Sequence, residues 1–180
     1  MIFRSLNLRR LARDTRGVSA VEFALIAPLM VSLYLGCVEI SDGVSAQRKV
    51  TLIASTIANL GAQSATLTTT DVSNILDAST AIIYPYSSST LKMTISCIAI
   101  DANKNATVKW SVTRNGTALS GSVTMPSALQ VANSQFVYAQ VSYGYKPAIG
   151  YTITGTLTLS ETMYMMPRIT APTYNSTACT

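Results

Sequence analysis

Histidine is absent from this 180-residue chain, and carboxylates are sparse. Without histidine the chain lacks the commonest general base, the usual zinc ligand and the partner of a nucleophilic serine or cysteine. After residue 42 the only carboxylates are Asp71, Asp77, Asp101 and Glu161, and no two of them have a spacing that suggests a catalytic dyad. We therefore do not expect an enzyme, a cofactor or a small-molecule substrate.

Cysteine is also scarce, with residues only at positions 37, 97 and 179 and no C-x-x-C pair. Three thiolates without histidine do not complete a four-ligand zinc site, so we expect no metal centre. Cys37 lies inside an apolar run and is most simply interpreted as a small buried hydrophobic residue.

Basic residues are concentrated at the N-terminus. Five arginines precede residue 17, accompanied by a single acid, Asp14, whereas the rest of the chain carries eight basic and seven acidic residues. The net charge of +5 therefore describes a short leader and not a basic face, and no nucleic-acid partner is expected. Arginines before an apolar segment favour a cytoplasmic N-terminus.

The chain is apolar overall and contains one long apolar run: 48% of its residues are hydrophobic and only 12% are charged. From Val18 to Val38 the only charge is Glu22, and at about 1.5 Å per residue this run spans roughly 30 Å, the thickness of a bilayer core. It is longer than a signal peptide's apolar region of roughly 7–15 residues. The sequence thus predicts a membrane-spanning helix with the following domain outside the cytoplasm; the resemblance described below implies a bacterial inner membrane and a periplasmic domain.

Helical periodicity continues past the apolar run, because Val50, Ile53, Ala54, Ile57 and Leu60 repeat at helical spacing. We expect one helix over about 19–60, with an amphipathic second half packed on the domain. Pro28 is expected to kink this helix, and Gly61 is expected to end it.

The remaining pattern predicts a small α+β domain. Residues 62–70 are expected to form a polar linker, and a helix is expected from Asp71 until Tyr84-Pro85 stops it. Period-two alternation predicts strands over 91–100, around 108–112, over 136–145 and over 152–166, with a turn at Asn115-Gly116 and a short turn or helical segment at 126–129. The predicted organisation is a leader at 1–17, a transmembrane and amphipathic helix at 18–60 and an extracytoplasmic domain at 61–180, whose antiparallel sheet has about four strands.

The junction Arg16-Gly17-Val18-Ser19-Ala20-Val21-Glu22-Phe23 resembles the prepilin processing site of type IV pilins. The resemblance implies that a prepilin peptidase cuts between Gly17 and Val18. It also implies that Glu22, beside Phe23, pairs with the freed amine of a neighbouring subunit and sets its register in a filament. The alternative is that Glu22 lies at the headgroup level, where a helix N-terminus favours a carboxylate.

Further motifs resemble the TadE/TadG-like family of minor pilins or pseudopilins of the tight-adherence (Flp) pilus. They are Trp110-Ser111, 126–129, 139–147, 155–160 and 164–168. The resemblance implies a pilin-like fold, assembly with other pilin and pilus-assembly subunits, and an adhesive role. Gln140 and Met166 depart from the family pattern, which often has Glu and Arg at these positions.

Cys97 and Cys179 both lie outside the cytoplasm in this topology, where thiols oxidise, and we predict a disulfide between them. Closing a loop of about 80 residues would stabilise the fold by roughly 4–5 kcal/mol at most. The tyrosines at 138, 143, 145 and 151 are interpreted as cross-sheet packing, with a binding surface as the alternative. Arg168 is expected to be solvated or carbonyl-bound, with a partner contact as its alternative.

The first functional hypothesis is a minor pilin or pseudopilin, cut after Gly17 and incorporated in a surface pilus. The second is an uncleaved, membrane-anchored scaffold of the same apparatus. An envelope hydrolase using serine and lysine is a weaker alternative, since no S-x-x-K motif occurs. Three N-x-[ST] triplets, which begin at Asn105, Asn115 and Asn175, match the N-glycosylation signal. They would suit a eukaryotic type II membrane glycoprotein, but we interpret them as turns.

Overall fold

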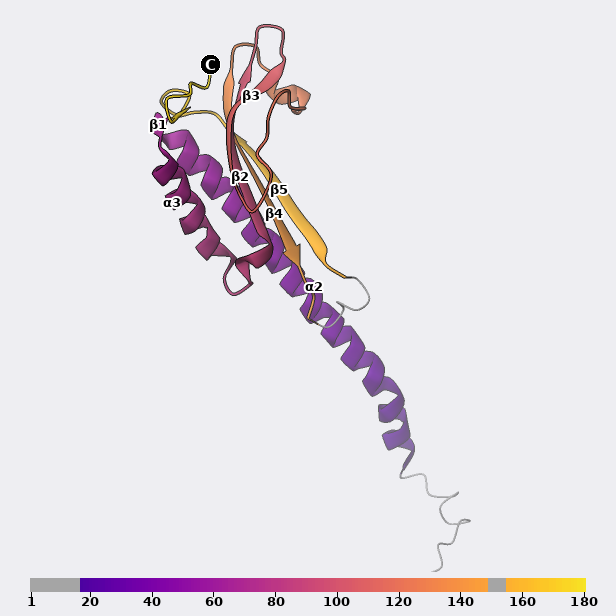
Figure 1. The fold of residues 1–180 in the computed structure, drawn as a ribbon. Helices are drawn as coiled ribbons and strands as arrows, with labels where there is room; N and C mark the ends of the chain where they lie inside the picture. Colours follow the sequence, from indigo (N-terminus) through magenta and orange to yellow (C-terminus); the bar gives the residue numbers. More distant parts are fainter. Residues whose placement is uncertain (1–16, 149–154) are drawn as a thin grey trace, which may run out of the picture. The chain divides into compact units, whose positions relative to one another are not determined.

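The structure is a computed structural model that describes residues 17–148 and 155–180 (Figure 1). The chain divides into two compact units, residues 1–41 and 42–180, each of which is described by itself. The five leader arginines and Tyr151 fall outside the described residues. Helix α2 (Val18–Gln63) contributes to both units, and all other elements belong to the second.

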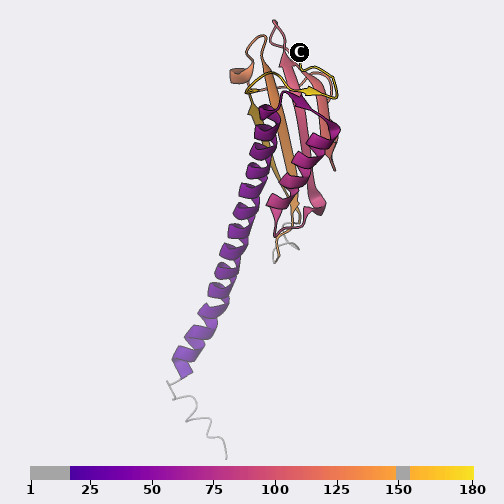
Figure 2. The ribbon, with the colours of Figure 1, turned by 90° about the vertical axis from the view of Figure 1, so that its left-hand side faces the viewer.

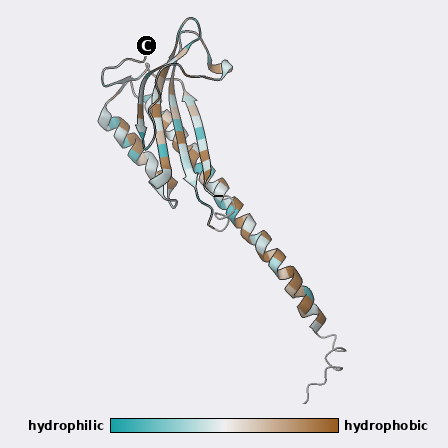
Figure 3. Cartoon of the chain, turned by 45° about the vertical axis from the view of Figure 1, so that its right-hand side comes forward, coloured by the Kyte–Doolittle hydropathy of each residue, from teal (hydrophilic) through white to brown (hydrophobic). Residues whose placement is uncertain are grey.

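In the first unit α2 is largely apolar, with Glu22 and Glu39 as its charged residues, and Pro28 lies inside it. In the second unit α2 buries one stripe at helical spacing and exposes the other side. Figure 3 colours the chain by hydropathy. The stripe consists of Ala46, Val50, Ile53, Ala54, Ile57, Ala58, Gly61 and Ala62. The predicted long helix with an amphipathic second half is therefore confirmed.

Gly61 does not end the helix, as the sequence had suggested, because α2 continues to Gln63. Its role is close packing. A Cβ built at Gly61 would lie 2.7 Å from Ile95 Cδ1 and 3.1 Å from Val137 Cγ1. Glycine is present here because the sheet approaches the helix backbone, and not because the backbone needs to turn.

The sheet has four antiparallel strands in the order β3-β2-β4-β5. They are β2 (Leu91–Ile100), β3 (Ala106–Arg114), β4 (Gln135–Tyr145) and β5 (Leu157–Met165). This confirms the predicted α+β class and a sheet of about four strands. Of the strand predicted over 152–166, the first three residues lie outside the described residues, and β5 begins at Leu157.

Both faces of the sheet are covered near β2. On one face α2 and α3 (Thr69–Thr80) pack against Leu91, Met93, Ile95 and Cys97, as Figures 1 and 2 show. On the other face a smaller core joins Ile98, Ile100, Ala106, Met125, Phe136 and Tyr138. The central strand β2 is consequently buried along almost its whole length.

The segment predicted as a linker is more structured than expected. Thr66–Leu67 forms β1, which pairs in parallel with β6 (Thr173–Tyr174). Thr68 then caps α3 by accepting a hydrogen bond from the backbone N–H of Asp71, whose carboxylate accepts one from the N–H of Thr68. These hydrogen bonds to Thr68 lower the pKa of Asp71. The helix begins two residues before the predicted Asp71, and the short helices η2 (Ala81–Ile83) and η3 (Ser88–Thr90) follow it.

The predicted turns are present. Asn115 and Asn175 have positive φ angles of 57° and 44°, which asparagine tolerates better than most residues. Asn105 donates its backbone N–H to the Asp101 carboxylate at 2.8 Å, which closes the β2–β3 turn. The segment predicted at 126–129 contains the short helix η4 (Ser127–Leu129).

One ion pair holds α3 to the edge strand β3. Arg114 Nη1 donates to the Asp77 carboxylate, and Arg114 Nη2 donates to Ser73 Oγ at 3.4 Å. The guanidinium lowers the pKa of Asp77. Because Asp77 is exposed, this pair contributes little to stability and mainly fixes where α3 lies.

Replacing Gly61 by valine is expected to destabilise the second unit by about 1–3 kcal/mol, because its branched side chain overpacks the contact with Ile95 and Val137. Gly43→Ala is the matched control, since a Cβ there meets Tyr145 Cε1 at an ordinary 3.7 Å. Denaturant unfolding of the full chain in detergent, followed by Trp110 fluorescence, measures both. Equal midpoints for Gly61→Val and wild type would contradict close packing at this position.

Candidate functional site

The candidate processing junction lies where α2 begins. Gly17 is exposed, with no atom within 4 Å of a Cβ built on it, and lies in a 3₁₀ turn that leads into α2. Val18, the first residue of α2, is 50% exposed. A peptidase must bind its substrate in an extended form, which an exposed glycine next to a helix end permits. The geometry thus leaves the Gly17–Val18 peptide bond unobstructed by the residues the structure describes.

Glu22 and Phe23 lie one turn further along α2, and both point away from any packed surface. Phe23 is 70% exposed, and the Glu22 carboxylate has no partner within the described ranges. A carboxylate without a partner near an apolar helix is unfavourable in a bilayer unless headgroups or a second molecule compensate its charge. The two sequence-based explanations of Glu22 both supply such compensation from outside the chain.

From Phe23 to Val38 the helix carries no charged residue and has no core to pack on within its own unit. Its most apolar window has a mean hydropathy of 2.0, and none of that window is buried. By length and composition α2 is the one helix in the described part of the chain able to cross a membrane. Cys37 lies in this segment and is exposed, so it is not the buried residue that the sequence suggested.

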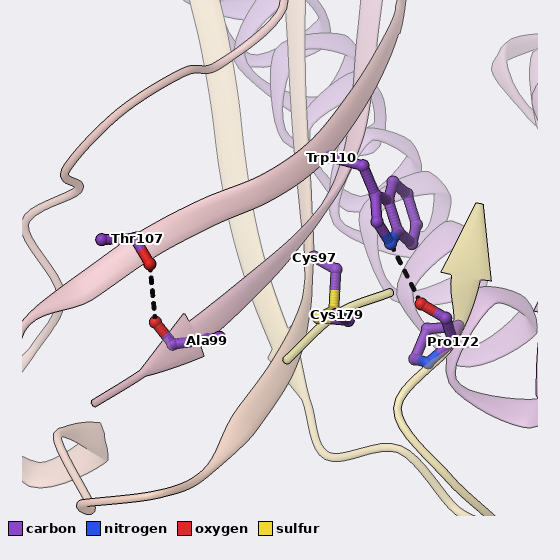
Figure 4. The surroundings of a disulfide bond; sticks show 6 residues. All are labelled: Cys97, Ala99, Thr107, Trp110, Pro172 and Cys179. Carbon is purple, nitrogen blue, oxygen red and sulfur yellow. Dashed lines mark hydrogen bonds between the residues drawn. A yellow bond between two sulfur atoms is a disulfide. The ribbon is translucent and has the colours of Figure 1, made fainter. Parts of the chain in front are cut away.

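In the second unit Cys97 of β2 is bonded to Cys179 near the C-terminus, with Cα atoms 5.9 Å apart (Figure 4). Both residues are buried, at 0% and 1% exposure. The disulfide that the sequence predicts is therefore present in the structure, and it holds the C-terminal tail against the central strand.

Other contacts hold the same tail. The Trp110 indole Nε1 donates to the Pro172 carbonyl at 3.0 Å (Figure 4). The Trp110 ring also packs on Tyr174, with centroids 5.5 Å apart. Asn175 donates its N–H to the Leu67 carbonyl at 3.1 Å and its amide to Thr69 Oγ1 at 2.8 Å. Trp110 therefore has a structural role, which the sequence did not reveal because its partners are more than sixty residues away.

The sheet tyrosines are packed, as the sequence favoured. Tyr138, Tyr143 and Tyr145 are each 5–6% exposed. Tyr138 meets Tyr164 of β5 edge-on, with centroids 5.2 Å apart, and burial raises the pKa of both hydroxyls. These rings stabilise the sheet and do not form an open binding surface.

Arg168 binds the N-terminal half of the unit without reaching a carboxylate. Its guanidinium donates to the Asn59 side-chain oxygen at 2.6 Å, and its backbone N–H donates to the Ala62 carbonyl at 2.9 Å. Gln140 pairs in the sheet with Thr94 and Thr162, whereas Met166 follows the last β4–β5 pair and is 59% exposed. The two departures from the family pattern thus lie in separate rows of the sheet.

Sequence reasoning missed one polar contact between α2 and β5. The Glu161 carboxylate accepts hydrogen bonds from Thr51 Oγ1 at 3.1 Å and Gln47 Nε2 at 3.4 Å. Thr51 and Gln47 are one helical turn apart, which is the only sequence signal that could have suggested a shared partner. The described residues hold no group of three or more metal-ligating side chains.

The chain thus combines a membrane-competent helix with a disulfide-linked α+β unit. The family model for TadE-like protein matches residues 17–59, which are the junction, the apolar run and most of the amphipathic half of α2. The match confirms the resemblance over this segment and suggests a role related to the Tad pilus. No curated protein and no solved structure matches the chain.

Removing the disulfide with Cys97→Ala and Cys179→Ala together is expected to lower the unfolding free energy by up to about 4–5 kcal/mol, because the bridge closes a long loop in the unfolded chain. The exposed Cys37 provides the control, since Cys37→Ser should leave the unfolding midpoint unchanged. Denaturant unfolding without reductant measures the difference. Free thiols at positions 97 and 179 in native protein would contradict the pairing.

Proposed function

We propose that the chain is a minor pilin or pseudopilin of a tight-adherence pilus, cut after Gly17 by a prepilin peptidase. The observation that carries the proposal is the junction itself. An exposed glycine immediately precedes an exposed apolar helix with Glu22 one turn inside it, and the TadE-like match begins at that glycine. The non-enzymatic character of such a subunit agrees with the lack of histidine.

The leader, the apolar half of α2 and the disulfide-linked unit have different roles in such a subunit. The leader, residues 1–17, stays in the cytoplasm, and the apolar half of α2 holds the subunit in the inner membrane and then packs with other pilus subunits. The disulfide-linked unit lies in the periplasm, where oxidation is favoured. In this account partners are recognised by helix packing and not through a small-molecule site.

Cleavage is tested on the mature N-terminus by mass spectrometry of membranes and of sheared surface material. Wild type is expected to begin at Val18, and Gly17→Val is expected to keep Met1, because a branched side chain next to the cut obstructs the peptidase. Gly36→Val is the matched control, since Gly36 also has open space around it but lies inside the helix. An intact Met1 in wild type, found only in membranes, would instead support an uncleaved scaffold.

The register role of Glu22 is tested with Glu22→Gln, which keeps the size of the side chain and removes its charge. We expect normal cleavage but about tenfold less protein in sheared material, equivalent to about 1.4 kcal/mol, because the freed amine of a neighbour loses its counter-charge. Glu22→Asp, which keeps the charge, should retain part of the assembly. Wild-type amounts of Glu22→Gln in sheared material would leave Glu22 with only the headgroup-level explanation.

A further inference from the structure

The two faces of the sheet carry different side chains. Helices α2 and α3 cover the face on which the apolar residues of β2 lie. Side chains alternate along a strand, so Lys92 and Thr94 of β2 point to the opposite face. On the neighbouring strand β4, Ser142 pairs with Lys92, and Gln140 pairs with Thr94. Two adjacent cross-strand pairs of polar residues therefore share this face.

The segment that follows β3 forms a wall beside these pairs. At its start Asn115 Nδ2 donates to the Leu91 carbonyl at 3.2 Å. Further along, the Leu119 backbone N–H donates to Ser111 Oγ at 2.9 Å. Between them a Cβ built at Gly116 would lie 2.8 Å from a threonine hydroxyl of β3, so the backbone comes close to the sheet there. The wall is therefore attached to the sheet at both of its ends.

A hollow of about 450 Å³ lies between the wall and the polar pairs. This volume is within the roughly 300–1,000 Å³ that is usual for pockets that bind small molecules. The described residues that line it include no aspartate or glutamate. Its polar lining comes from Lys92, Thr94, Gln140 and Ser142 of the sheet and from Asn115 and Thr117 of the wall.

Three of these polar groups are available to a ligand. The Thr94 hydroxyl already shares a hydrogen bond with Thr113 Oγ1 at 3.1 Å, and Asn115 uses its amide nitrogen on the sheet. In contrast, the side chains of Lys92, Gln140 and Ser142 have no hydrogen-bond or ion-pair partner in the part of the chain that the structure describes. An ammonium, an amide and a hydroxyl group thus face the hollow without partners.

This set of groups matches an acidic sugar. An ammonium forms a charge-assisted hydrogen bond with a carboxylate. Amide and hydroxyl groups both donate and accept hydrogen bonds, as the alcohol groups of a sugar do. Neighbouring strands lie about 4.8 Å apart, and alternate residues of a strand lie about 6.7 Å apart, so the two pairs cover an area that suits one sugar ring with its substituents. A bare phosphate would occupy the ammonium group and leave the others without a partner.

We propose that this hollow binds a uronic acid residue of a glycan, with its carboxylate on Lys92 and its hydroxyl groups on Gln140 and Ser142. The sugar is held and not converted, and other pilus subunits are still recognised through α2. The site lies wholly within the second unit, so it goes beyond the proposed function and depends on neither cleavage nor pilus assembly. It adds a ligand class, acidic saccharides, to a subunit that otherwise binds only protein and lipid.

The test is a titration of the ¹⁵N-labelled full chain with glucuronic acid at neutral pH, followed by NMR. The micelles are of lauryldimethylamine oxide, because a detergent with a sugar headgroup would compete for the site. We expect glucuronate to shift the backbone amide signals of Thr94, Gln140 and Gly116 saturably, with a Kd at least about tenfold lower than that of glucose, because only glucuronate carries a charge for the ammonium. Absence of saturable shifts would overturn the site.

Two variants and a matched control assign the contacts. Lys92→Gln is expected to raise the Kd of glucuronate about tenfold and to leave that of glucose unchanged, because it removes the ammonium alone. Ser142→Phe is expected to abolish binding of both sugars by filling the hollow, and an unchanged unfolding midpoint shows that it is folded. Lys109→Gln removes the same charge from an exposed lysine of β3 that does not line the hollow, and it should change neither Kd.

The remaining outcomes separate a sugar site from simpler explanations. If Lys109→Gln weakens glucuronate as much as Lys92→Gln, the attraction is one of net charge and the site is overturned. Inorganic phosphate that shifts the same amides with the same Kd would also overturn it, because only an anion would then be recognised. A lower Kd for an oligogalacturonate than for galacturonic acid supports a glycan chain as the ligand, whereas equal values support a single sugar in the same hollow. Lys92→Gln should still be cut after Gly17, so a failure of cleavage and a failure of this site remain distinguishable.

Discussion

The second unit depends on the packing of α2 against the central strands of the sheet. Small residues, Ala54, Ala58, Gly61 and Ala62, form much of the contact stripe, so the helix backbone approaches Ile95 and Val137 closely. Bulkier side chains in this stripe would hold the helix and the sheet further apart. The disulfide and the Trp110 hydrogen bond attach residues 172–179 to the same sheet.

The same helix changes its surface along its length, and this change underlies the proposed function. From Phe23 to Val38 α2 carries no charge and is largely exposed on all sides, which suits lipid or the helices of other subunits. From Asp42 onward only one side is apolar, and the protein covers it. The partly buried polar residues Gln47 and Thr51, which lie beside this stripe, donate hydrogen bonds to Glu161 of β5 and link the helix to the sheet edge.

Much of the fold follows from the sequence because its signals are local. The apolar run, the period-two strands and the capping residues near Asp71 predict α2, the sheet and α3 within a few residues. Gly61 was interpreted wrongly, since a glycine near a helix end predicts a cap unless the partner surface is known. The β1–β6 pair and the Trp110 contacts join residues far apart in the chain, which no local pattern records. The junction at Gly17 remains a prediction from its motif.

The central claim, that α2 spans the membrane with the folded unit outside the cytoplasm, is tested most directly by cysteine labelling in bacterial spheroplasts. In a Cys37→Ser background, Asn103→Cys reports on the folded unit and Ser5→Cys on the leader. The account predicts that a membrane-impermeant maleimide labels Asn103→Cys in intact spheroplasts and labels Ser5→Cys only after lysis. Labelling of Ser5→Cys without lysis, or protection of Asn103→Cys until lysis, would contradict it.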